Sequence, residues 1–170
     1  MSHHAKDTRH HTIGAPLRGA GAISEKEHDP YKPKGKPSEP AVCPDCRAVF
    51  HAGRWQWLAA AADAHDELCP ACRRVRDEFP AGVVTLEGSF LHDHHAEVMA
   101  LVNHHADRVK SEHPLQRIMG TEATDGGVQI TTTDMHLARG IGEALHNAYR
   151  GDLKYHHEPG QDLLRVHWQR

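Results

Sequence analysis

The sequence predicts an α+β protein of 170 residues in three parts. Four cysteines form two CPxC motifs in the first half, which is typical of a small metal-centred unit. The second half alternates helical and strand-like patterns in the order α-β-β-α-β-β. We therefore expect a disordered arm over residues 1–40, a zinc-ribbon-like unit over 41–88, and an α+β domain over 89–170 with a mostly antiparallel sheet.

The N-terminal arm contains few side chains that could be buried. Residues 31–40 read YKPKGKPSEP, and their prolines disfavour a helix. Residues 1–40 carry seven Lys and Arg against five Asp and Glu, so the arm is mildly basic within a chain of net charge −3. We expect it to be disordered, or ordered only on a partner. It is either a solubilising tail or an arm that binds polyanions.

The cysteines predict a closed structural zinc site. Two residues between thiolates let a tight turn direct both sulfurs at one ion, and two such turns complete a tetrahedron. The expected ligands are Cys43, Cys46, Cys69 and Cys72. Because four protein ligands leave no position for a catalytic water, we expect one Zn²⁺ with a structural role. Two disulfides or a redox-active CxxC are the alternatives.

An arginine, Arg47 or Arg73, follows each cysteine pair. If either position requires a left-handed backbone, the strain is about 1–2 kcal/mol. Structural zinc contributes about 10–16 kcal/mol, so such strain is tolerable.

A hairpin and a short helix are expected between the two cysteine pairs. The run RAVFHAGRWQW alternates, which predicts that Trp55 and Trp57 share one strand face. The alanine-rich residues Ala59 to Leu68 predict a helix that leads to the second pair. The tryptophans either fill the core or stack on bases. The candidate RNA-binding residues are Arg47, Arg54, Trp55, Trp57, Arg73, Arg74 and Arg76.

Two helices and two hairpins are expected after the second cysteine pair. A short strand over Val83–Leu86 precedes a helix over residues 90–112, for which Ser89 is the expected cap. Strand-like runs then flank Asp125-Gly126, a strong hairpin signal.

The last part of the chain repeats this helix-hairpin pattern. Asp134 is expected to cap a helix over residues 135–150, with Leu137, Ile141, Leu145 and Ala148 inward. Gly151 is its stop signal, and the final hairpin is expected to turn at Pro159-Gly160.

Enzyme motifs are absent from the sequence. It contains no GxxxxGK[ST], GxGxxG, HExxH or GxSxG, and no small-molecule substrate is indicated. We expect a non-enzymatic protein, although His94 and His95 leave a metal-dependent nuclease open. No run approaches the roughly 20 apolar residues of a membrane span. Since no apolar segment follows Met1, we expect a cytoplasmic protein.

The chain contains 18 histidines, many of them in adjacent pairs. Imidazole is a common metal ligand, and its charge changes near neutral pH. A metal-responsive or metal-buffering protein is therefore the alternative function. Solvated surface histidines explain the same pattern without a metal.

Several motifs together resemble a known family. They are EPAVCPDC, GRWQW, CPACRR, EGSFL, TTTDMHLARGIGEALHNAYRGDL and RVHWQR. This combination is similar, from about Asp29 to Arg170, to small bacterial proteins labelled "NMD protein affecting ribosome stability and mRNA decay". Their label reflects similarity to the zinc-bearing front part of the NMD-type ribosome-export adaptor, which this chain resembles mainly through its paired CxxC motifs.

The resemblance implies a zinc-ribbon protein that associates with the ribosome or RNA, including under stress. It assigns the four cysteines to zinc and supplies no catalytic residue. Family members tend to have CGAV followed by Tyr or Phe after the first turn. This chain has Cys46-Arg47-Ala48-Val49-Phe50 instead, which keeps the ligand but changes the residue in the turn.

Overall fold

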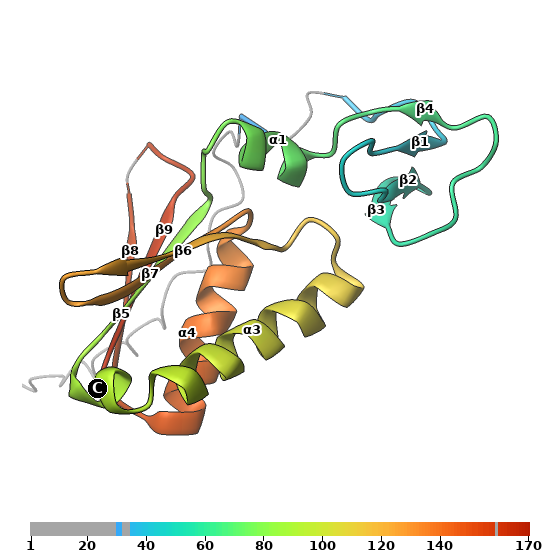
Figure 1. The fold of residues 1–170 in the computed structure, drawn as a ribbon. Helices are drawn as coiled ribbons and strands as arrows, with labels where there is room; N and C mark the ends of the chain where they lie inside the picture. The colour runs from blue at the N-terminus through green and yellow to red at the C-terminus, as the bar shows by residue number, and fades with distance from the viewer. Residues whose placement is uncertain (1–29, 32–34, 159) are drawn as a thin grey trace, which may run out of the picture.

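The computed structural model describes residues 30–31, 35–158 and 160–170 (Figure 1). Most of the predicted arm and Pro159 lie outside these residues. The described chain forms a four-stranded sheet, a five-stranded sheet and four helices, so the predicted α+β class is confirmed. Among the described helices, none has the length and apolar character needed to cross a membrane.

The four-stranded sheet belongs to the cysteine-containing part of the chain, residues 41–76, which we call the zinc unit. Its strand order is β3-β2-β1-β4, with β1 antiparallel to β2 and parallel to β4. A seven-residue helix, α1, follows. The bounds are β1 Ala41–Val42, β2 Val49–His51, β3 Arg54–Gln56, β4 His65–Asp66 and α1 Pro70–Arg76.

The helix expected over Ala59 to Leu68 is not formed, and this prediction is wrong. The chain there runs through turns into β4, whose pairing with β1 is continued by the Glu67 amide donating to the Val42 carbonyl at 3.0 Å. This pairing carries the chain from β4 to Cys69 beside the first cysteine pair. Alanine's helix propensity is a weak preference, and the tertiary requirement outweighs it.

The five-stranded sheet forms the α+β domain, with strand order β6-β7-β5-β9-β8. Only the β5–β9 pairing is parallel, so the sheet is mostly antiparallel, as predicted. The β6–β7 hairpin turns at Asp125-Gly126, also as predicted. The bounds are β5 Gly82–Glu87, β6 Ile118–Thr124, β7 Gly127–Thr132, β8 Asp152–His157 and β9 Leu164–Gln169.

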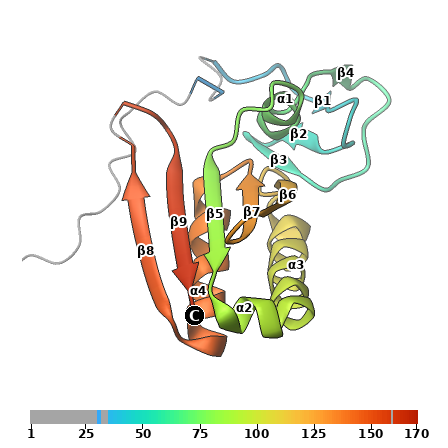
Figure 2. The same cartoon turned by 60° about the vertical axis from the view of Figure 1, so that its left-hand side comes forward.

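Strand β5 occupies the centre of this second sheet. The sequence-based division placed residues 83–86 in the zinc unit, but β5 pairs along its whole length with β7 on one side and β9 on the other. The short segment between Arg76 and Gly82 therefore connects the zinc unit to the α+β domain. The zinc unit lies above one end of the larger sheet (Figure 2).

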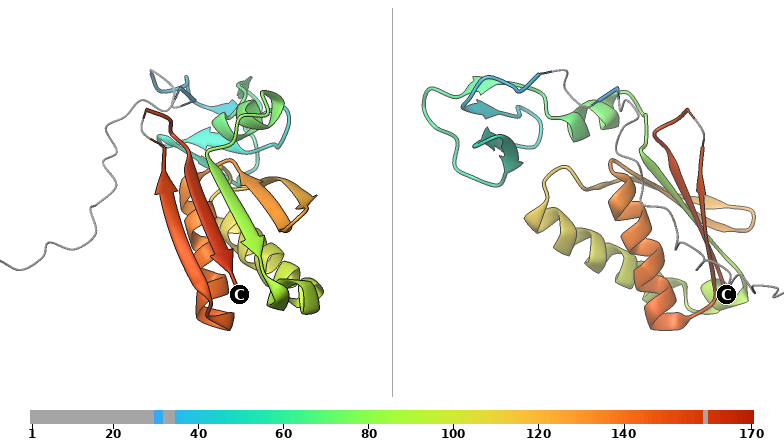
Figure 3. Two further views of the ribbon diagram at one scale, coloured as in Figure 1. Left: turned by 90° about the vertical axis from the view of Figure 1, so that its left-hand side faces the viewer. Right: turned by 180° about the vertical axis from the view of Figure 1, so that it is seen from behind.

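The helices cover one face of the large sheet (Figure 3). Their bounds are α2 Ser89–Asp93, α3 His95–Glu112 and α4 Met135–Tyr149. The single helix expected over 90–112 is interrupted at His94, whose backbone leaves the helical region at φ −123°. Ser89 lies inside α2 rather than at its cap, which is Gly88.

Helix α4 follows its sequence signals closely. The Asp134 carboxylate accepts hydrogen bonds from the amides of His136 and Leu137, at 2.7 and 3.2 Å. Leu137, Ile141 and Leu145 are fully or almost fully buried, whereas Ala148 is exposed. These leucines and isoleucine pack with Val84, Leu86, Val98, Val102, Val166 and Trp168 in the main core.

Candidate metal centre

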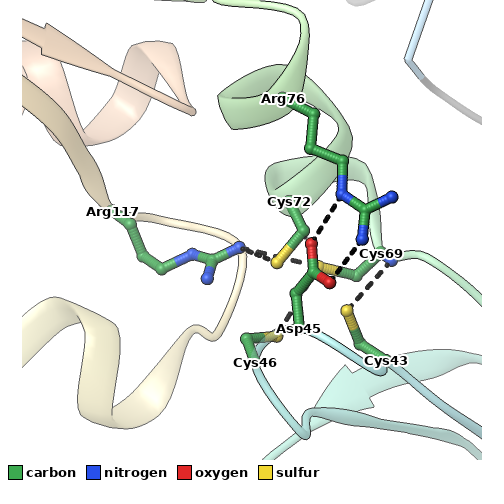
Figure 4. A network of polar contacts seen from close by, with 7 residues as sticks. All are labelled: Cys43, Asp45, Cys46, Cys69, Cys72, Arg76 and Arg117. Carbon is green, nitrogen blue, oxygen red and sulfur yellow. Dashed lines mark hydrogen bonds and ion pairs between the residues drawn. The ribbon is translucent and has the colours of Figure 1, made fainter.

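The two cysteine pairs come from two different kinds of local structure (Figure 4). Cys43 and Cys46 lie in a tight turn after β1, closed by the Cys43 amide bonding to Ala48 and the Arg47 amide bonding to the Cys43 carbonyl. Cys69 is the N-cap of α1, and its sulfur accepts a hydrogen bond from the Cys72 amide at 3.4 Å. Proline at the first position of α1 fits a helix start.

The four sulfurs converge on one point. All four Sγ atoms lie within 4.8 Å of one another, and those of Cys46 and Cys69 are 3.7 Å apart. A zinc tetrahedron with Zn–S bonds of about 2.3 Å requires sulfurs about 3.8 Å apart. The cluster therefore suits one metal ion, and four soft thiolate ligands favour zinc.

Burial distinguishes the four ligands. Cys43, Cys69 and Cys72 are buried and Cys46 is partly exposed. All four are free thiols, so the two-disulfide alternative is not formed. Because the sulfurs share one cluster, the site fits a closed structural centre rather than an isolated redox pair.

The crowded thiols perturb one another's acidity. The hydrogen bond with Cys69 lowers the pKa of Cys46 to about 4. The same bond, together with burial, raises the pKa of Cys69. Burial raises the pKa of Cys72, against the opposing effect of a hydrogen bond from Arg117.

Arg117 was not among the predicted site residues. It lies between α3 and β6, and its Nη2 donates to the sulfurs of Cys72 at 3.2 Å and Cys69 at 3.6 Å. Burial lowers the pKa of Arg117, but its hydrogen bond to Cys72 and the neighbouring thiolate charges outweigh burial and raise it overall. No local pattern marks this residue, because its partners are more than 40 positions away.

A second arginine links the two cysteine turns. The Arg76 guanidinium, on α1, forms a bidentate ion pair with Asp45 in the first turn, at 2.8 and 2.5 Å (Figure 4). This pair bridges the elements that carry the ligands. Arg76 is thus engaged within the zinc unit rather than directed only at solvent.

The remaining candidate RNA-binding residues divide into buried and exposed groups. Trp55 packs against Phe50 in the zinc-unit core, and Arg74 is buried, with its guanidinium 4.4 Å from the Tyr31 ring centroid. The exposed candidates are Arg47, Arg54, Trp57 and Arg73. The tryptophans do not share an environment, because β3 ends at Gln56 and the Trp57 indole instead donates to the Lys110 carbonyl at 2.6 Å.

The turn after Cys46 holds Arg47 at φ 66°, a left-handed conformation that glycine adopts without strain. Arg73, by contrast, lies within α1. We expect Arg47→Gly to stabilise the zinc unit by about 1 kcal/mol. Chelator competition for bound zinc measures this gain. Arg47→Ala is the control, since it removes the side chain but keeps the Cβ; equal stability of the two variants would contradict the strain.

The histidines do not assemble a second site in the described part of the chain. His92 contacts Asp93 at 3.2 Å and His94 contacts Glu97 at 3.5 Å, both on the surface. Within the described ranges, the four cysteines are the one group of three or more metal-competent side chains that converge. The pairs His3-His4 and His10-His11 lie outside those ranges.

Comparisons with family models, with curated proteins and with solved structures give no significant match. The family resemblance carried by the sequence motifs therefore stays a prediction. What the geometry supports directly is a metal-binding protein whose four-cysteine centre is suited to a single zinc ion.

Proposed function

We propose that this chain is a non-enzymatic zinc protein that docks on RNA or a ribosomal subunit through exposed residues of its zinc unit. Ribosome stability or mRNA decay is the process it would affect. The observation that supports this proposal most is that the side chains of Arg47 and Arg54 are available for contact. Both are exposed, and neither has an ion-pair partner within the part of the chain that the structure describes.

The proposed docking surface is smaller than the sequence suggested. It comprises Arg47, Arg54, Trp57 and Arg73. Arg73 is only loosely paired, at 3.7 Å from Glu67, with about half of its side chain exposed. Exposed arginines form charge-assisted hydrogen bonds with the phosphate oxygens of RNA, and such contacts supply most of the affinity. An exposed indole can stack on an unpaired base. Trp55 and Arg74 are buried, and Arg76 is held in a bidentate ion pair with Asp45, so these three are left out of the proposal.

The test is co-sedimentation with ribosomes and titration with single-stranded RNA at several salt concentrations. The Arg47→Glu/Arg54→Glu double variant should weaken binding at least about tenfold. It should also reduce the slope of log K against log salt by about 1.4, for two lost phosphate contacts. The matched control is Lys154→Glu/Arg108→Glu. It changes the net charge of the protein by the same amount as the test variant, but at two residues of the α+β domain, and it should bind as the parent does.

Failure has a clear signature here. If the zinc-loaded protein sediments free of ribosomes and RNA at both low and moderate salt, the proposal is wrong, since phosphate contacts strengthen as salt falls. Equal weakening in both double variants would also count against it, because only overall charge would then matter.

Metal buffering by histidine is the competing function. It requires a second metal equivalent bound with submicromolar affinity after the cysteines are filled. A metal titration followed by calorimetry decides this, and loose binding alone argues against it. Within the described residues, the histidines do not converge into a second group of metal-competent side chains, so no observation there supports metal buffering.

A further inference from the structure

A zinc ion held by four thiolates carries two formal negative charges. Within the zinc unit, the amides of Cys69 and Cys72 donate to the sulfurs of Cys43 and Cys69, both at 3.4 Å. These donors are neutral. Among the described residues, the cation that hydrogen-bonds to the sulfurs is Arg117, and it comes from the other domain.

The backbone of Arg117 is fixed to the α+β domain by Thr133. The Arg117 amide donates to Thr133 Oγ1 at 2.8 Å, and the Thr133 amide donates to the Arg117 carbonyl at 2.9 Å. Thr133 is buried, and its hydroxyl also donates to the Leu115 carbonyl at 2.6 Å. The guanidinium therefore extends from a rigid base toward the metal centre.

Among the described residues, two other contacts also join the two parts of the chain beside α3. The Trp57 indole donates to the carbonyl of Lys110 near the end of α3, and Leu115 packs against the zinc-unit core. Between α1 and α3 lies a cleft of about 360 Å³, with Val75 on one side, Ala106 on the other and Arg117 in its lining. The Arg117 contact with the sulfurs thus lies beside a cleft and crosses the junction as a charge-assisted hydrogen bond.

We propose that Arg117 is a latch through which metal binding fixes the position of the zinc unit against α3. With zinc bound, the sulfurs of Cys69 and Cys72 are held in place and offer the guanidinium a doubly charged partner. Without the metal, the small zinc-unit core cannot hold those acceptors in position, and the latch opens. The α+β domain thereby responds to whether the metal site is filled.

The three tryptophans supply internal probes for this latch. Trp57 reports on the junction through its indole bond to Lys110, Trp55 reports on the zinc-unit core, and Trp168 reports on the main core through its bond to Arg150. Their indole N–H signals can be followed separately by NMR in the full chain. Single Trp→Phe variants assign each signal.

The decisive variant is Arg117→Gln with zinc in excess. We expect the Trp55 and Trp168 signals to keep their parent positions, while solvent exchange of the Trp57 indole proton rises about tenfold or more. Chelating zinc from the parent protein should raise it in the same way. Arg108→Gln, which removes an exposed guanidinium on α3, is the matched control and should leave Trp57 unchanged. Zinc affinity in Arg117→Gln should fall about 10–100-fold.

Three results would overturn the latch. The first is a Trp57 signal that is the same in Arg117→Gln and in the parent. The second is a Trp57 signal that ignores zinc removal. The third is loss of the Trp55 signal in Arg117→Gln despite excess zinc, which would mean that Arg117 is needed for folding of the zinc unit and not only for its position.

A further variant, Arg117→Lys, keeps the charge and should give intermediate exchange of the Trp57 indole proton. Parent-like exchange in both Arg117→Lys and Arg117→Gln excludes the latch. RNA binding plays no part in these readouts.

Discussion

Cys69→Ser should abolish stable zinc binding and unfold residues 41–76 while the α+β domain stays folded. Cys69 is fully buried, caps α1 and lies with its sulfur 3.7 Å from the sulfur of Cys46. Serine removes the thiolate ligand, although its hydroxyl still accepts a hydrogen bond at the helix cap, so the loss of zinc is what the variant tests. Structural zinc contributes about 10–16 kcal/mol, most of which an incomplete site forfeits. Elemental analysis and amide exchange measure the two effects.

The expected boundary of this unfolding follows from the two separate cores. The zinc-unit core consists of Ala41, Cys43, Ala48, Phe50, Trp55, Cys69, Ala71 and Cys72, which is too small to stand alone. The main core needs none of these residues. Val75→Ala, on the exposed side of α1, is the control. One retained equivalent of zinc, or parent-like protection of residues 41–76, would contradict the prediction.

Trp168→Ala should cost the α+β domain about 3–5 kcal/mol of unfolding free energy. Trp168 is fully buried at the end of β9, and its indole donates to the Arg150 carbonyl at 2.8 Å. Alanine would leave a large cavity and a carbonyl without its donor. Urea denaturation followed by circular dichroism measures the loss.

Two comparisons sharpen this prediction. Trp168→Phe keeps most of the apolar contact and should cost clearly less than alanine. Zinc stoichiometry should be the same in both variants under native conditions, because the metal ligands belong to the other core. A loss below about 1.5 kcal/mol for Trp168→Ala would mean that the site collapses around the cavity.

The features that the sequence predicted correctly depend on short stretches of chain. The CPxC spacing of the four ligands, the Asp125-Gly126 hairpin and the Asp134 cap each act over two to four residues, so their chemistry is visible without knowing the rest of the fold. Helix α4 likewise follows from its own apolar spacing. The possible strain at Arg47 was also readable, because the turn after a cysteine pair favours glycine.

The features that it missed depend on distant partners. Ala59 to Leu68 is not helical because His65 and Asp66 pair with β1 as β4, and β5 belongs to the second sheet because β7 and β9 flank it. Arg117 lies 48 and 45 positions along the chain from Cys69 and Cys72, so its contact with the sulfurs depends on tertiary structure. Arg74 is buried because Tyr31 and Phe79 lie against its guanidinium, an arrangement that no count of surface arginines reveals.

The central position of β5 has a mechanical consequence. The zinc unit is attached to the start of β5, and the chain ends just after the far end of β9, its parallel neighbour (Figure 2). Tension between the zinc unit and the C-terminus would pull these two strands past each other and load their shared hydrogen bonds all at once, in shear, instead of peeling them apart singly. If the zinc unit is held by a partner, the α+β domain would therefore resist unfolding under a force that pulls it away from the zinc unit.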